Sequence, residues 1–130
     1  MIAFKQLESW KACHALTLAV HEAVKPFLGR EPDIADRLRL AALLSASKLA
    51  RGAGTGNERM FRQCAELSAG YLSEIAYFLS LARAMGLMPE ETWRELDALR
   101  GRASFYVWKH VLPKPPKDVP DLPAEDTLTP

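Results

Sequence analysis

Apolar residues recur every three or four positions over four stretches of this chain, and glycine or proline residues separate the stretches. This spacing places apolar side chains along one face of an α-helix. No stretch alternates apolar and polar residues as a half-buried β-strand does. The pattern therefore predicts an all-α fold, an up-and-down antiparallel four-helix bundle over residues 1–112.

The predicted helices cover about residues 4–28, 33–51, 55–85 and 89–111. Pro26, Gly29 and Pro32 are expected to end the first helix, with Pro26 kinking its last turn. The expected N-cap of the second helix is Asp33 or a neighbour just after Pro32. Gly86 is a good terminator for the third helix, and Pro89 suits the first turn of the fourth.

Three of these helices have a predicted core stripe. In the first helix it is Leu7, Trp10, His14, Leu18, His21 and Val24; in the second, Ile34, Leu38, Ala42, Ser45 and Leu49; in the fourth, Trp93, Leu96, Leu99, Ala103, Val107 and His110.

The segment "SKLARGAGTGN", residues 47–57, combines basic residues with glycines, as phosphate-binding loops do. In a P-loop, however, the lysine follows the glycines and a strand precedes them, whereas Lys48 precedes them here and follows a helix. We therefore expect the glycines at positions 52, 54 and 56 to stop the second helix. Thr55 and Glu58 have the spacing of a capping box that starts the third.

Residues 113–130 differ in composition from the rest of the chain. They contain six prolines and few large apolar residues, and no basic residue follows Lys117. The acidic residues beyond that point are Asp118, Asp121, Glu125 and Asp126. This composition predicts an extended Pro-rich acidic tail, separate from the bundle.

Overall composition indicates an ordinary water-soluble protein, with 48% hydrophobic and 25% charged residues. No apolar run approaches the ~20 residues that a membrane-spanning helix needs, and no leader-like pattern opens the chain. The two cysteines, Cys13 and Cys64, are too few for a disulfide framework. We therefore expect a cytoplasmic protein with buried thiols and no membrane partner.

Two of the predicted helices carry more apolar surface than one buried face requires. In the second helix the additional apolar residues are Leu40, Leu43 and Leu44, and in the fourth they are Phe105 and Trp108. A partner subunit is the simplest cover for such surface, so we predict that these residues form an interface. For the leucines, the alternative is ordinary exposure of single apolar side chains. For Phe105 and Trp108, which lie on the side that carries Arg94, Arg102 and Lys109, the alternative is stacking on nucleobases.

Basic residues are concentrated between Arg37 and Arg62, where six bases accompany one acid, Glu58. The candidates for phosphate contact in this region are Arg37, Lys48, Arg51, Arg59 and Arg62. All of them except Arg37 bracket the start of the third helix, whose free N–H groups also attract anions. This local excess predicts a nucleic-acid partner, either RNA or DNA.

Catalytic and metal-binding patterns give no candidate. His14 and His21 are seven residues apart, whereas zinc-binding histidines on one helix are usually three or four apart. Cys13 and His14 are adjacent, so their side chains diverge by about 100° on a helix. Glu66 and Glu74 lack the Glu-x-x-His pairing of a di-iron bundle. We expect no enzyme activity, no metal and no cofactor.

A family resemblance appears in "RLRLAALLSASKLARG" and "FRQCAELSAGYLSEIAYFLSLARAMGLM". These runs resemble the four-helix-bundle proteins of the 23S rRNA intervening-sequence type, which include the accessory protein of diversity-generating retroelements. The matching residues are Phe4, Leu7, Trp10, Arg39, Ala41, Ala42, Ala50, Gly52, Gly70 and Glu74. The positions that depart from the family pattern are Leu40, Lys48, Arg51 and Tyr71, and "KLARG" stands where the family has "NIAEG".

The resemblance implies a ring-shaped homopentamer of four-helix bundles. For the retroelement accessory protein it also implies binding to nucleic acid and to a reverse transcriptase. Two hypotheses follow for this chain. It is either an oligomeric nucleic-acid-binding adaptor, working with a reverse transcriptase or ribosomal RNA, or a structural scaffold that binds only protein.

Overall fold

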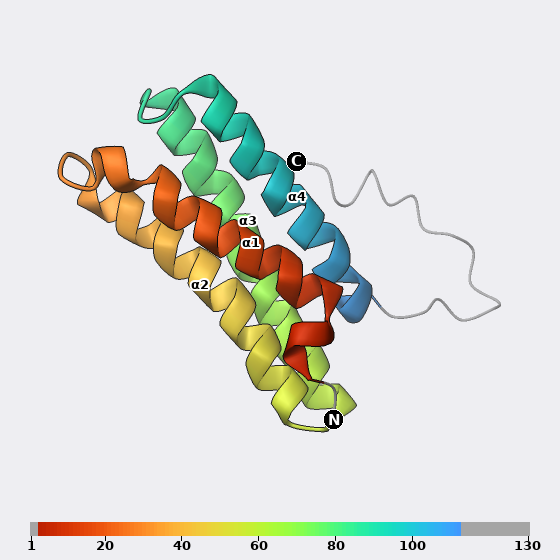
Figure 1. Cartoon of the computed structure of the whole chain (residues 1–130). Helices are drawn as coiled ribbons and strands as arrows, with labels where there is room; N and C mark the ends of the chain where they lie inside the picture. The colour runs from red at the N-terminus through yellow and green to blue at the C-terminus, as the bar shows by residue number, and fades with distance from the viewer. Residues whose placement is uncertain (1–2, 113–130) are drawn as a thin grey trace.

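The computed structural model describes residues 3–112, and α-helices account for most of them (Figure 1). The helices are α1 (Glu8–Ala23), α2 (Pro32–Gly54), α3 (Glu58–Ala84) and α4 (Glu90–Val111), with short 3₁₀ helices η1 (Phe4–Gln6) and η2 (Lys25–Phe27). Residues 3–112 contain no β-strand, so the predicted all-α fold is confirmed. The tail predicted for residues 113–130 lies outside the described residues.

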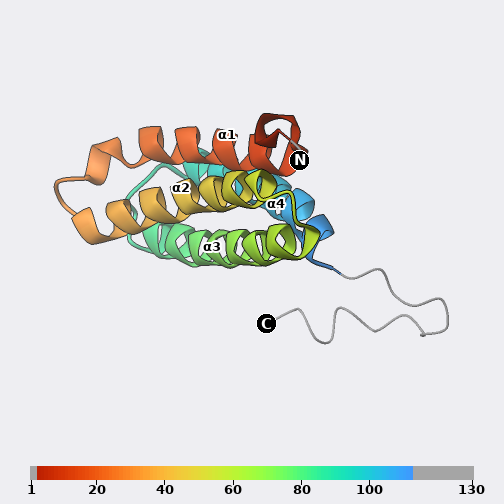
Figure 2. The same ribbon diagram turned by 90° about the horizontal axis from the view of Figure 1, so that it is seen from below.

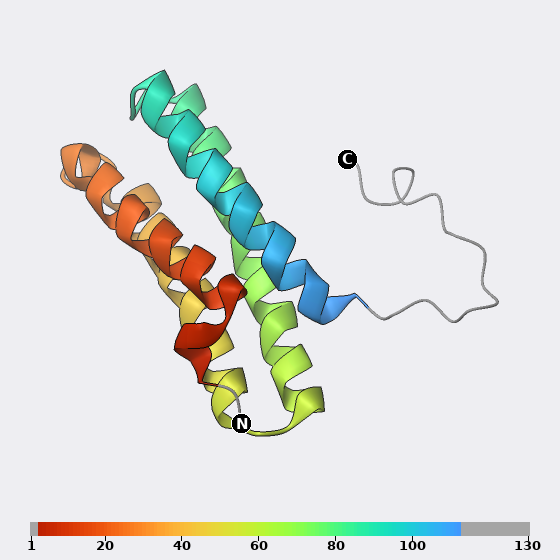
Figure 3. The same ribbon diagram turned by 45° about the vertical axis from the view of Figure 1, so that its right-hand side comes forward.

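Each helix packs against its neighbours in the chain, and α4 returns to pack against α1 (Figures 1 and 2). The helices run alternately up and down, which confirms the predicted antiparallel bundle. The α2–α3 turn, the start of η1 and the end of α4 share one end of the bundle (Figure 3). The α1–α2 and α3–α4 connections lie at the other.

The core is built mainly from the predicted faces of α2 and α4. All five residues of the predicted α2 stripe are buried, and so are Leu96, Ala103 and Val107 of α4. Trp93, Leu99 and His110 complete the α4 stripe as half-buried residues. The stripes hold in these helices although many of their buried residues are small, because Ile34, Leu38 and Leu49 of α2 and Leu96 and Val107 of α4 recur at helical spacing and are buried.

The predicted core stripe of α1 is largely wrong. His14, Leu18 and His21 are exposed, and the buried face consists mainly of smaller residues. The buried residues of α1 are Ser9, Ala12, Cys13, Leu16, Thr17 and Val20. The Thr17 hydroxyl donates to the carbonyl oxygens of Cys13 (2.8 Å) and Ala42 (2.9 Å), so a polar residue occupies a core position without an unmet hydrogen bond.

Other boundaries also differ from the sequence prediction. The first predicted helix is divided into η1, α1 and η2. An extended residue, Leu7, separates η1 from α1, and α1 ends before η2 because Pro26 cannot continue an α-helical ladder. Helix α2 begins at Pro32, with Glu31 at the N-cap position and no side-chain cap, so Asp33 is not the N-cap. Gly86 has φ +67° and ends α3 as predicted.

The turn after α2 corrects the prediction for residues 52–58. Helix α2 continues through Gly52 to Gly54, and only Gly56, at φ +66°, has a left-handed backbone. Asn57, not Thr55, caps α3, and its side-chain oxygen accepts from the N–H of Met60 at 3.0 Å. Thr55 instead donates its hydroxyl to the Gly52 carbonyl at 2.7 Å. The capping-box prediction was wrong because Asn57 immediately precedes α3, and asparagine is one of the best N-cap residues.

Candidate functional site

The outer face of α2 carries the first group of predicted site residues. Leu40 and Leu43 are 47% and 48% exposed, and Leu44 is half-buried. The basic residues Arg37 and Arg51 are exposed on the same helix. The apolar surface expected from the sequence is therefore present on α2, at residues that face solvent.

Contacts with the neighbouring helices divide this face into two sides. The hydrogen bond from Thr17 to Ala42 marks the side toward α1, and the approach of Gly52 to Cys64 marks the side toward α3. At about 100° per residue, Leu43 lies on the α1 side. On the α3 side are Leu40, Leu44, Arg37, Lys48 and Arg51.

Exposed apolar residues of α1 extend the surface on one side of α2. Leu18 is exposed, and the Trp10 and His14 rings stack with their centroids 4.7 Å apart. At about 100° per residue, these residues lie on the side of α1 that faces α2, which is the side from which Thr17 contacts Ala42. Sequence reasoning assigned them to the core; the small residues four positions apart, Ser9, Cys13 and Thr17, were the missed signal.

On its other side α2 adjoins the face of α3 that carries Met60 and Leu67. Both residues are exposed, and Tyr71 beside them is half-buried. They lie on the same side of α3 as Cys64 and Ser68, whose contacts are with α2. Sequence reasoning assigned none of the three to an interface and named only Tyr71, as a departure from the family pattern, although they recur at spacings of seven and four.

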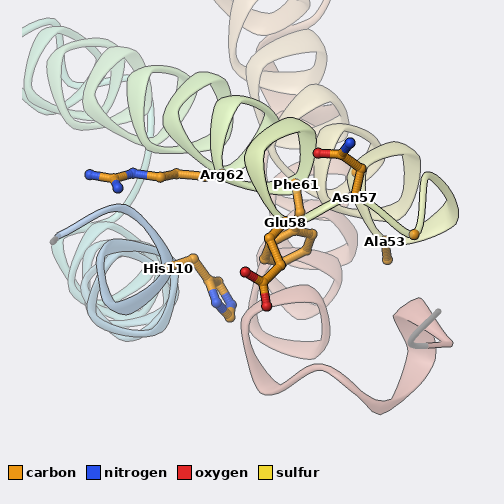
Figure 4. A pocket seen from close by; sticks show the side chains of 8 residues that line it. Ala53, Asn57, Glu58, Phe61, Arg62 and His110 are labelled. Carbon is orange, nitrogen blue, oxygen red and sulfur yellow. The ribbon is translucent and has the colours of Figure 1, made fainter. Parts of the chain in front are cut away.

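The five predicted phosphate-binding residues do not form one cluster. Arg37 and Arg51 are 14 positions apart on α2, which corresponds to about 21 Å along the helix. Arg62 projects toward α4, where it lines a hollow with His110 (Figure 4). It also pairs with Glu66 across 3.9 Å.

Most of the predicted phosphate-binding residues have no ion-pair partner within residues 3–112. Those without one are Arg37, Lys48, Arg51 and Arg59. Three of these four lie along the α3 side of α2, and Arg59 lies in the first turn of α3. Their charges are therefore available to an external anion.

The hollow that Arg62 lines is at the end of the bundle where α2, α3 and α4 meet. It has a volume of about 500 Å³ and is lined by Gly52, Ala53, Gly56, Asn57, Glu58, Phe61, Arg62 and His110. Glu58 and His110 point into the same space (Figure 4). The Phe61 and His110 rings meet edge to face, 4.9 Å apart. Sequence reasoning placed His110 in the core and did not foresee the hollow, which depends on residues about 50 positions apart.

A hydrogen bond of 2.8 Å joins Ser9 Oγ to His110 Nε2. The distance suits a nucleophile and its general base, but Ser9 is only 1% exposed and does not line the hollow. The bond therefore fixes α1 to α4, and burial lowers the pKa of His110. Burial similarly raises the pKa of the Cys13 thiol, which keeps it protonated and unreactive at neutral pH.

Helix α4 carries the remaining predicted interface residues, Phe105 and Trp108. They are 60% and 39% exposed, as expected for residues off the core stripe. The Lys109 ammonium lies 4.3 Å from the centre of the Phe105 ring, and the Arg102 guanidinium lies 5.5 Å from that of Tyr106. Cations over aromatic faces thus flank this part of α4.

No protein-family model matches this chain, and no curated protein sequence matches it significantly. Within the described part of the chain, none of the helices is both long and apolar enough to cross a bilayer. Residues 3–112 also hold no group of three or more His, Cys, Asp and Glu side chains arranged for a metal ion.

Proposed function

We propose that this chain is a non-enzymatic helical-bundle protein that self-associates through the outer face of α2. Leu40 and Leu43, each nearly half exposed, are the observation that supports the proposal most directly. Leu18 of α1 and Leu67 of α3 flank them, so the exposed apolar surface spans three helices. Apolar surface of this extent on a small bundle is typical of a protein–protein interface.

The family resemblance gives the proposed assembly a definite form. Members of the 23S rRNA intervening-sequence type form homopentameric rings, and we propose the same for this chain. Lys48 and Arg51 lie on the α3 side of this face, at the positions where the family has Asn and Glu. In a ring, these two cations would either face carboxylates of a neighbouring copy or remain available to an external anion.

The mass of the full-length protein in solution tests this proposal, measured by light scattering during size-exclusion chromatography. We expect a mass close to five copies. Leu40→Glu should reduce it because it places a charge within the contact. Ser80→Glu, which adds the same charge at an exposed position on the side of α3 away from α2, is the matched control. A monomer of the unaltered chain over a wide range of concentrations would refute the proposal.

A second candidate function is nucleic-acid binding, as for an adaptor that works with a reverse transcriptase or ribosomal RNA. It is supported by the absence of ion-pair partners for Arg37, Lys48 and Arg51 within residues 3–112. Because the contacts would be to phosphates, binding should depend weakly on sequence and strongly on salt.

The probe for this candidate is a fluorescent single-stranded RNA of mixed sequence, titrated at 50 mM and 200 mM salt. We expect measurable binding at the lower salt and a loss of about tenfold or more at the higher. Lys48→Glu with Arg51→Glu should abolish binding, whereas Lys25→Glu, an exposed change at the other end of the bundle, should have a small effect. If no binding occurs at 50 mM salt, the scaffold function remains.

A further inference from the structure

An exposed stripe runs along the outer face of α4. Its residues recur at alternating spacings of four and three; they are Arg94, Ala98, Gly101, Phe105, Trp108 and Leu112, of which Gly101 is half-buried and the others are exposed. Large apolar side chains occupy the C-terminal half of the stripe, and the small residues Ala98 and Gly101 follow toward the N-terminus. The stripe is separate from the α2 face of the proposed assembly, because α2 and α4 lie diagonally across the bundle (Figure 2).

We propose that residues 113–123 of the same chain fold back along this stripe, with their prolines against Phe105 and Trp108. The segment "PKPPKDVPDLP" begins directly after Leu112, at the end of the stripe where these two rings lie. Proline-rich segments favour the polyproline II conformation, and exposed aromatic side chains are their usual docking surface.

Charge complementarity supports the same placement. Arg94 and Arg102 have no ion-pair partner within residues 3–112 and lie on or beside the stripe. The segment has no net charge, because Lys114 and Lys117 balance Asp118 and Asp121, but both carboxylates come after both lysines and would lie farther along α4 from Leu112. Carboxylates of the segment would therefore meet cations of α4 that the bundle itself leaves unpaired.

The lengths of the two elements agree with this pairing. A polyproline II segment rises about 3.1 Å per residue and an α-helix about 1.5 Å, so each segment residue passes about two helix residues. If the chain reverses directly after Leu112, Asp118 lies beside about residue 100 of α4. If the reversal uses two residues, Asp118 lies beside about residue 104. The same count places Asp121 at about residues 94–98. Arg102 lies within the first of these two ranges, and Arg94 lies within the second.

Because the segment is covalently attached to the end of α4, even a weak contact would hold it on the stripe. A segment joined to its docking surface by one or two residues has an effective concentration in the millimolar range or above. The docked segment would cover Phe105 and Trp108, so any partner that uses these rings would have to displace it.

Disulfide trapping in the full-length chain tests the proposal. In the variant with Ala98→Cys and Val119→Cys, mild oxidation should form an intramolecular bond, detected by peptide mapping and mass spectrometry. One control moves the tail cysteine out of register, pairing Ala98→Cys with Thr127→Cys. The other moves the helix cysteine to the basic α2 helix, pairing Ser47→Cys with Val119→Cys. We expect the first pair to react at least tenfold faster than both controls.

Equal rates for the three pairs would overturn the proposal, and faster reaction of the α2 pair would place the segment on α2 instead. A charge exchange tests the register. Asp121→Arg should slow trapping, and adding Arg94→Asp should restore it; failure to restore would contradict the pairing of these two residues. The first pair and the Ala98→Cys, Thr127→Cys control share the same helix cysteine on α4, so the comparison of these two pairs is independent of association through the α2 face.

Discussion

Gly52 of α2 lies so close to Cys64 of α3 that a Cβ on the glycine would be 2.8 Å from the Cys64 Cβ. It would also lie 3.2 Å from the Phe61 Cα, which is backbone and cannot move aside easily. The glycine therefore sets the spacing of the two helices beside the turn, within an α-helix that it does not end.

Replacing this glycine should destabilise the bundle. Gly52→Ala improves helix propensity by about 1 kcal/mol but forces α2 and α3 apart, at a cost of about 2–3 kcal/mol. We expect a net loss of about 1–2 kcal/mol in the free energy of unfolding, measured by urea denaturation. Gly70→Ala is the matched control, because a Cβ there meets nothing within 4 Å. It should be neutral or stabilising by up to about 1 kcal/mol; a stabilising Gly52→Ala would contradict the close approach.

His110 should make the stability depend on pH. Burial lowers its pKa in the folded protein below the ordinary value of 6.5, so the unfolded chain binds the proton more readily. The free energy of unfolding should be at its full value above pH 6.5 and fall as the pH decreases through 6.5 toward the folded pKa.

Urea denaturation between pH 5 and pH 8 measures this dependence. His110→Gln should remove much of the fall in the free energy of unfolding below pH 6.5. His14→Gln, at an exposed position of α1, should retain that fall. The groups that face His110 are Ser9 of α1 and Glu58, Phe61 and Arg62 of α3. An unchanged slope in His110→Gln would show that another group carries the dependence.

The Cys13 thiol should resist alkylation in the folded protein. It is fully buried and its pKa is raised, so both access and the fraction of thiolate are low. Iodoacetamide should modify it at least a hundredfold more slowly in buffer than in 6 M guanidinium chloride, as followed by mass spectrometry of the peptides. Rapid modification in buffer would mean that α1 opens readily from the bundle.

The Thr17 hydroxyl should contribute to the packing of α1 on α2. Thr17→Val preserves the shape of the side chain and removes its bonds to the carbonyls of Cys13 and Ala42. We expect the free energy of unfolding, measured by thermal or urea denaturation, to fall by about 1 kcal/mol. Thr92→Val, at a half-buried position in the first turn of α4, is the control. Equal losses in both variants would indicate a general effect of the substitution.

The helical pattern alone predicted the four-helix fold and the inner faces of α2 and α4, because a few large apolar residues such as Ile34, Leu38, Leu49 and Leu96 recur at helical spacing and specify one face. It failed for α1, where Ser9, Cys13 and Thr17 face the core. Small and polar residues carry no strong periodic signal, and their burial depends on partners such as Ala42 and His110. The end of α2 was misplaced for a similar reason, since the need for Gly52 arises from α3.

For the candidate site, the exposure of Leu40, Leu43, Phe105 and Trp108 could be anticipated from their angular positions. The separation of Arg62 from Arg37, Lys48 and Arg51 could not, because it depends on how α3 is rotated relative to α2 and α4. The hollow around His110 could not be predicted from the sequence either, because it forms only where α2, α3 and α4 pack together.

The two ends of the bundle should differ in how well they accept new sequence. At one end, the close approach of Gly52, the Asn57 cap and the Ser9–His110 bond constrain residues 52–58 and their surroundings. At the other, the connection between α1 and α2 passes through exposed Gly29 and Arg30, and a Cβ on Gly29 would meet nothing within 4 Å. A peptide epitope or a small reporter domain is therefore best inserted after Gly29, where natural variants of this bundle would also be expected to acquire extra length.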